Sequence, residues 1–113
     1  MNIEELREYC ISKPYVTEEF PFGPEVIVYK VKGKAFLLVP LDTDVLQFNC
    51  KNLPEENIIL REQYMSVQPG YHMAKKHWNT IQCNGELTDH QIRTFVDISF
   101  RLVVAGLPKA LRF

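Results

Sequence analysis

Glycine and cysteine are both scarce in this chain, which has 5 glycines and 3 cysteines among 113 residues. A loop that cradles a nucleotide phosphate needs several closely spaced glycines just before a helix. None of the five glycines stands in a G-x-G or G-K-[ST] pattern, and no G-x-S-x-G nucleophile elbow occurs. These absences argue against a known phosphate-binding loop and against serine-hydrolase chemistry.

The cysteines are too few and too far apart to form a framework. Cys10, Cys50 and Cys83 form no C-x-x-C pair, and an odd number suits neither paired disulfides nor a thiolate zinc site. No apolar stretch approaches the roughly 20 residues of a membrane helix. Residues 1–5 are acidic where a secretory signal would be basic. We therefore expect reduced, structural cysteines in a cytoplasmic protein with no membrane partner.

The three histidines lack the spacing of a metal or catalytic site. His72 and His77 are five residues apart with no carboxylate between them, whereas a zinc-protease helix places two histidines four apart around a glutamate. His90 falls in the first turn of the last predicted helix, where we expect it to be solvated. Cys83 lies about 20 Å from His77 along an extended strand, too far for a thiol–imidazole pair. We predict no metal, no cofactor and no catalytic residues.

What the chain does contain is typical of one globular domain spanning residues 1–113. Its hydrophobic fraction is 46% and its charged fraction 24%, both close to the globular average. The formal net charge is −1, but residues 1–60 carry ten acids and six bases, and residues 61–113 carry four acids and seven bases. This asymmetry allows a positive face on a nearly neutral protein.

The periodicity of apolar residues predicts three helices and five strands. We expect helices from Asn2 to Pro14, from Pro54 to Tyr64 and from Thr88 to Gly106, and strands over 26–31, 35–39, 45–50, 66–68 and 78–83. Residues 14–24 contain three prolines and a glycine and are predicted to be an irregular connection. The predicted order is α-β-β-β-α-β-β-α. It indicates a two-layer α+β fold in which the helices cover one face of an antiparallel sheet.

One segment stands out by its chemistry. Residues 71–80, Tyr-His-Met-Ala-Lys-Lys-His-Trp-Asn-Thr, contain two lysines, two histidines and two aromatic residues but no acid. Lysines suit phosphates and aromatic rings suit base stacking, so the mixture is typical of a nucleic-acid contact. Short basic runs are more often solvated, however, and the same residues are also typical of a surface loop that leads into a strand and is anchored in the core by Trp78.

Several motifs resemble the MmcQ/YjbR family over essentially the whole chain. They are the opening Ile3–Cys10 followed by Lys13-Pro14, the stretch Val67–Ile81 with its P-G-Y-H-M-x-K-x-H-W motif, and the segment Asp97–Val103. Phe100 replaces the tyrosine of the Ser-Tyr pair that is common in that family. The resemblance implies a small fold similar to secretion chaperones and a DNA-binding role through a double-wing arrangement of sheet hairpins. It implies no cofactor and no reaction.

These observations predict a non-enzymatic binding domain with DNA as its leading ligand. The predicted contact residues are His72, Lys75, Lys76, His77 and Arg101, with Lys109 and Arg112 extending the surface. The alternative is a protein-interaction module of chaperone-like architecture, which would use the exposed sheet face or an edge strand. A small enzyme ranks third.

Overall fold

The computed structural model describes residues 1–113 and confirms the predicted α+β class. The helices are α1 (Ile3–Ile11), α2 (Pro54–Gln63) and α3 (Asp89–Ala105), and the strands are β1 (Val16–Glu19), β2 (Val26–Val31), β3 (Lys34–Pro40), β4 (Gln47–Lys51), β5 (Val67–Pro69) and β6 (Trp78–Gln82). A short 3-10 helix, η1 (Lys109–Leu111), follows α3. All six strands form one antiparallel sheet in the order β1-β2-β3-β4-β6-β5.

The prediction of an irregular connection over residues 14–24 is wrong for β1. Val16 to Glu19 pair with Val31 to Val28 of β2 and form an edge strand. A strand of four residues between prolines is difficult to predict, because its apolar–polar alternation is too short to distinguish it from a loop. The rest of the segment is irregular, and Tyr15, with φ of 62°, turns the chain from α1 into β1.

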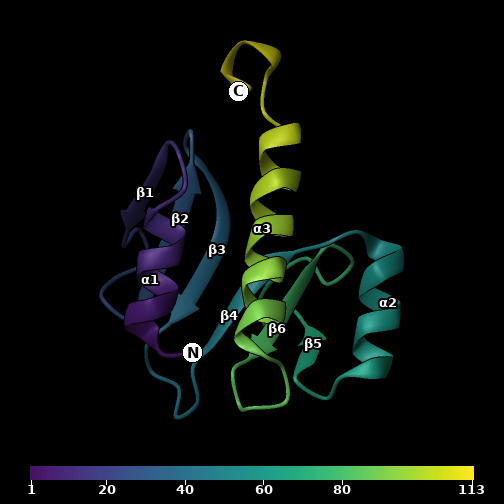
Figure 1. Cartoon of the computed structure of the whole chain (residues 1–113). Coiled ribbons are helices and arrows are strands. Elements are labelled where there is room, and N and C mark those ends of the chain that lie inside the picture. Colours follow the sequence, from purple (N-terminus) through teal and green to yellow (C-terminus); the bar gives the residue numbers. More distant parts are fainter.

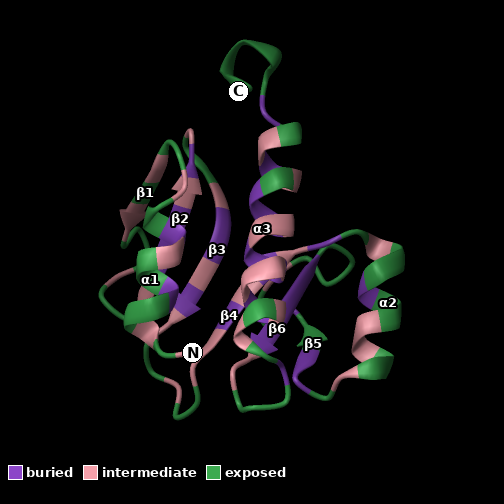
Figure 2. Cartoon of the chain, viewed as in Figure 1, coloured by how far each residue is buried: buried purple, intermediate pink, exposed green.

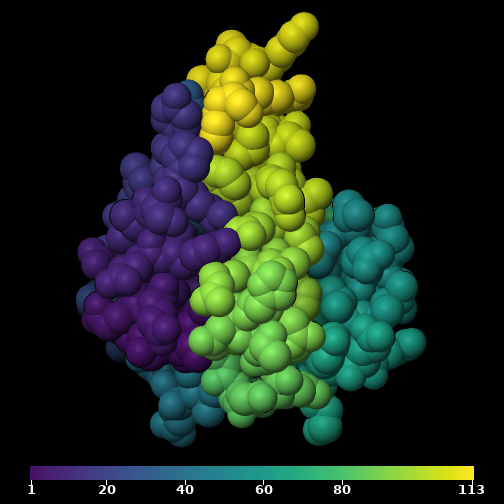
Figure 3. All heavy atoms as spheres, in the orientation of Figure 1, coloured from purple at the N-terminus to yellow at the C-terminus, as the bar shows by residue number.

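The helices begin where the capping residues predict. Asn2 and Glu5 form a capping box at the start of α1, and Thr88 and Gln91 form another at the start of α3. Figure 1 shows α3 in front of the sheet, between α1 on one side and α2 on the other. In the space-filling view α3 lies between α1 and α2, and the C-terminal segment (yellow) extends past the helices (Figure 3).

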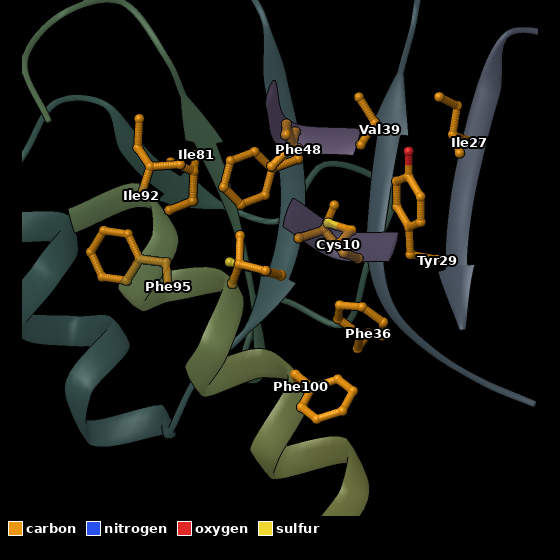
Figure 4. Packing of buried hydrophobic residues seen from close by; sticks show 14 of the residues in the cluster. Cys10, Ile27, Tyr29, Phe36, Val39, Phe48, Ile81, Ile92, Phe95 and Phe100 are labelled. Carbon is orange, nitrogen blue, oxygen red and sulfur yellow. The ribbon is translucent and has the colours of Figure 1, made fainter. Parts of the chain in front are cut away.

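The core lies between the sheet and the α1–α3 pair. Phe48, Ile81 and Tyr29 point from the sheet toward Cys10 of α1 and Ile92 of α3 (Figure 4). Buried segments follow the strands and the sheet-facing side of α3, whereas the outer side of α2 is exposed (Figure 2). The helix predicted from Thr88 to Gly106 is confirmed, and it contributes Ile92, Phe95, Val96 and Val103 to the core.

A buried serine joins α3 to the sheet. The Ser99 hydroxyl donates to the Phe36 carbonyl at 2.5 Å and accepts from the Lys51 N–H at 2.8 Å. The side chain is fully buried, and these two bonds satisfy it. These hydrogen bonds fix the position of α3 along its axis relative to β3 and β4.

A second polar contact joins α1 to α3. Burial alone would raise the pKa of Asp97, but hydrogen bonds from Lys13 and Tyr9 outweigh burial and hold that pKa below its ordinary value. The carboxylate therefore stays charged and holds the end of α1 against the middle of α3.

None of the three helices combines the length and the apolar composition that crossing a bilayer requires.

Candidate nucleic-acid interface

Strand register places the turn between β2 and β3 and the loop between β5 and β6 at the same end of the sheet. Lys34 pairs with Val31 beside the first turn, and Lys51 at the end of β4 pairs with Trp78 at the start of β6. The loop, residues 70–77, leads directly into Trp78. The C-terminal segment also reaches this end, as Figure 1 shows.

We call this end of the sheet the basic end, because it gathers lysines and arginines from separate segments. They are Lys32 of the β2–β3 turn, Lys34 at the start of β3, Lys51 of β4, Lys75 and Lys76 of the loop, and Lys109 and Arg112 of the C-terminal segment. The Lys32 ammonium lies 4.1 Å from the Tyr15 ring centroid and 5.6 Å from that of Phe113, which brings the C-terminal segment to the β2–β3 turn. The acids at this end are Glu55 and Glu56 of the first turn of α2.

The opposite end of the sheet carries acids. The turn after β3 holds Asp42 and Asp44, and its Leu41 N–H donates to the Glu25 carbonyl at 2.7 Å. The turn after β6 holds Glu86, and Asp89 opens α3 beside it. Positive side chains therefore lie at one end of the strands and negative side chains at the other. The charge counts of the two halves of the sequence do not predict this separation.

The 70–77 loop is fixed from beneath by two residues of α2. Asn57 is fully buried; its amide nitrogen donates to the Lys76 carbonyl at 3.1 Å, and its amide oxygen accepts from Asn79 at 2.6 Å. Arg61 donates to the Asn79 amide oxygen at 2.8 Å and to the carbonyls of Lys75 and Trp78. A buried, satisfied network of this kind gives the loop one defined backbone path.

Arg61 also adds an uncompensated positive charge beneath the loop. Burial lowers the pKa of its guanidinium, yet an arginine stays protonated in proteins. No carboxylate lies within salt-bridge distance of it. From Gln63 to Gly85 the chain contains no acid at all. The loop is therefore positive both in its side chains and in its support.

Gly70 and His72 shape the entry to the loop. A side chain at Gly70 would meet the Trp78 Cβ at 2.9 Å and the Met73 Cβ at 3.0 Å, so only glycine fits this close approach. His72 has φ of 60°, and its ring lies 4.0 Å from that of Tyr71. The Tyr71 N–H donates to the Thr80 hydroxyl at 3.0 Å, which holds the entry against β6.

The predicted contact residues of the loop are all exposed. His72, Lys75, Lys76 and His77 lie on the surface, whereas Trp78 is 8% exposed and is the structural anchor that the sequence predicts. The Lys75 ammonium donates to the Gly70 carbonyl at 2.9 Å and keeps two further protons for a ligand. The loop thus combines a fixed backbone with free cationic side chains.

Arg101 does not join the loop residues in one cluster. It is exposed and lies one helical turn after Asp97, on the side of α3 that faces Lys13 and α1. The loop is held by α2, on the other side of α3 (Figure 1). The basic residues that sequence reasoning missed at this end are Lys32, Lys34, Lys51 and Arg61. Strand register is the information that places these residues at this end, and the sequence alone does not give that register.

The structure brings no metal ligands together, and burial raises the pKa of all three thiols. No group of three or more histidine, cysteine, aspartate or glutamate side chains is placed to hold a metal ion. The three cysteines are free; burial raises the pKa of Cys10 to about 12 and that of Cys83 to about 11, and raises that of Cys50 further. His77 and Cys83 flank opposite ends of β6.

The YjbR family model matches residues 11–102 of this chain. The chain belongs to the YjbR family. It is 36% identical to the uncharacterised protein YbdF of Escherichia coli O157:H7, a match that covers 94% of this chain and 87% of YbdF. It is 33% identical to the uncharacterised protein YjbR of Escherichia coli strain K12, over 99% of this chain and 95% of that one. The predicted family is confirmed.

Solved structures share the fold. The crystal structure of Deinococcus radiodurans protein DR2400, with the domain DUF419, has a TM-score of 0.91 and 33% identity, and the match covers 97% of this chain and 84% of that one. A crystal structure from Pseudomonas syringae has a TM-score of 0.79 and 27% identity, over 90% of this chain and 98% of that one. Both matches show that the fold is shared.

Proposed function

We propose that this YjbR-family chain is a non-catalytic DNA-binding domain that contacts phosphates with its basic end. The observation that carries the proposal is the gathering of lysines from the β2–β3 turn, β4 and the 70–77 loop at one end of the sheet. Nucleic-acid affinity rests largely on neutralised phosphates, and each lysine that binds one releases condensed counterions. A protein with almost no net charge can still bind DNA when its positive side chains lie on one surface.

The loop is the best placed of these segments. Its backbone is fixed by Asn57 and Arg61, so little backbone conformational entropy is lost when Lys75 and Lys76 meet phosphates. Sheet hairpins that carry basic tips are an established way to reach into a nucleic-acid groove. The acids at the opposite end repel phosphates and would orient the protein with its basic end toward the ligand.

The absence of catalysis is part of the proposal. The cysteines are the strongest nucleophiles in the chain, and burial raises the pKa of each thiol, which keeps them protonated at neutral pH. No serine or threonine hydroxyl donates to the ring of a histidine, as the activation of a nucleophile would require; Thr94 donates only to the backbone carbonyl of His90.

A salt titration tests the proposal. Replacing both Lys75 and Lys76 with alanine should weaken binding to all DNA sequences about equally, because phosphate contacts carry no base information. It should also flatten the slope of log affinity against log salt concentration by about 1 per lysine. Fluorescence anisotropy of a labelled duplex at several salt concentrations measures both quantities.

The matched control removes the same charge elsewhere. The double variant Arg7→Ala/Arg93→Ala lies on the helix layer, away from the loop, and should leave the salt slope nearly unchanged. Equal slopes for the wild type and the lysine variant would contradict the assignment of the loop. No binding at low salt would contradict the DNA-binding proposal as a whole.

A protein partner is the second candidate, and one observation favours it. On the outer side of α2, Ile58 is 61% exposed and Ile59 49%, and Met65 just after the helix is 85% exposed. Adjacent exposed apolar side chains are a feature of interaction surfaces. A chain that binds no DNA at low salt would leave this surface as its best-supported contact.

A further inference from the structure

The face of the sheet opposite the helices carries a groove that the phosphate contacts do not use. Register places Val28, Leu38, Asn49 and Thr80 in one row across β2, β3, β4 and β6, with their side chains on this face. Over the row lies a hollow of about 900 Å³. Its walls are the β1–β2 connection on one side and the 70–77 loop on the other.

The walls and the floor of this groove differ in chemistry. Phe22, which is 73% exposed, stands on one wall, and Tyr71, which is 67% exposed, stands on the other beside His72. Val28 and Leu38 form an apolar floor. Gln47 and Asn49 offer amide groups at its β4 side, and the Asn49 oxygen already accepts from Thr80 at 2.6 Å. An aromatic ligand with polar edges fits such a site.

We propose that the groove binds unpaired bases of a single-stranded nucleic acid, stacked against Tyr71 and Phe22. This inference rests on the proposed DNA-binding function and names the form of nucleic acid it prefers. Exposed aromatic rings beside a cationic surface are the general means of binding single strands, because every base has a face that stacks. A concave hollow between two loops admits a base that is free of its partner, whereas a paired base is held inside the duplex.

The shared loop ties the groove to the basic end. Tyr71, His72 and Met73 line the groove, and Lys75 and Lys76 follow within the same fixed loop. A strand whose phosphates lie against these lysines has its bases beside the groove. Charge favours this occupant over an apolar peptide, since the loop wall is cationic and carries no acid. The groove's own acid, Asp42, lies at the far end of the sheet.

The polar side chains of the groove can form hydrogen bonds with the edge of an unpaired base. Amide side chains both donate and accept hydrogen bonds, as the Watson–Crick edge of an unpaired base requires. Lys30 also lines the groove, but its ammonium is held by Glu19 at 3.2 Å, so it adds little net charge there. The phosphate-binding charge is therefore outside the groove and the stacking surface inside it.

The test compares a labelled thymidine 10-mer with a labelled 10-base-pair duplex by fluorescence anisotropy at one low salt concentration. Wild-type protein should bind the single strand more tightly. Tyr71→Ala should weaken single-strand binding roughly 5- to 150-fold, since loss of one stacked base costs about 1–3 kcal/mol. Phe22→Ala, on the opposite wall, should weaken it in the same direction. Neither variant should change the salt slope.

Tyr71→Phe keeps the ring and should bind the single strand nearly as the wild type does, and Met65→Ala, at an exposed site outside the groove, should change nothing. Salt-dependent binding that is equal for both DNA forms and unaffected by Tyr71→Ala and Phe22→Ala would overturn the groove inference and leave the proposed function standing. No salt-dependent binding to either form would overturn both. Retained far-UV circular dichroism shows that each variant is folded.

Discussion

Replacing Phe48 with alanine is expected to lower the free energy of unfolding by about 3–5 kcal/mol. Phe48 is fully buried on β4, a central strand, and points toward the helix layer (Figure 4). The substitution removes the transfer energy of the ring and leaves a cavity that the surrounding strands and helices cannot fill. A domain of this size has a stability of about 5–15 kcal/mol, so the loss is a large part of the whole.

Chemical denaturation measures this loss as a lower midpoint with an unchanged slope. Phe22→Ala is the matched control, because the same ring is removed from a site that is 73% exposed. It should change stability by no more than about 0.5 kcal/mol. Similar midpoints for the two variants would show that the core does not lie between the sheet and the α1–α3 pair.

Replacing Asn57 with alanine should produce the second large effect, a destabilisation of about 1–3 kcal/mol. The substitution leaves the Asn79 amide nitrogen without an acceptor and the Lys76 carbonyl without a donor, although Arg61 still donates to the Asn79 amide oxygen. Alanine is the better helix former, so any loss observed reports the broken network rather than the helix. Because the network fixes the 70–77 loop, the variant should also bind DNA more weakly than the wild type.

Two readouts check this prediction. Denaturation reports the stability, and hydrogen exchange of the amides of residues 70–77 reports the order of the loop. Glu56→Ala is the control, since it is exposed in the same helix and makes no side-chain hydrogen bond to the loop. A loop that exchanges no faster in Asn57→Ala than in Glu56→Ala would show that α2 does not hold it.

Local signals in the sequence predict most of the fold. Asn2 and Thr88 fix the starts of α1 and α3, because each caps its helix by contacts within four residues. The alternation over residues 45–50 places Phe48 and Cys50 in the core, as the structure confirms. β1 escapes prediction because a four-residue edge strand is stabilised by its pairing with β2, which is a contact between distant residues.

The sequence likewise predicts one part of the candidate site and not the other. The composition of residues 71–80 singles out the loop, and Trp78 anchors it as predicted. The sequence predicts Arg101 as a contact residue together with the loop, yet α3 carries it to the side of Lys13. Lys32 and Lys51 join the basic end through antiparallel pairing, and sequence charge counts contain no information about pairing.

The groove depends entirely on tertiary structure. Phe22 and Tyr71 are separated by about half of the chain, and neither belongs to a motif that predicts a shared site. Their loops approach each other because the sheet places β2 and β6 on either side of β3 and β4. Antiparallel topology therefore builds the groove from two segments that no sequence signal links to each other.

Mapping the bound surface tests the central claim most directly. Titration of ¹⁵N-labelled protein with a short DNA oligonucleotide at low salt reports, amide by amide, where the ligand lies. We predict that the shifts concentrate at the β2–β3 turn, at Lys51 and at residues 70–77, and that the turn holding Glu86 stays unchanged. Shifts confined to the acidic end or to the outer side of α2, or no shifts at all, would contradict the claim that the basic end binds DNA.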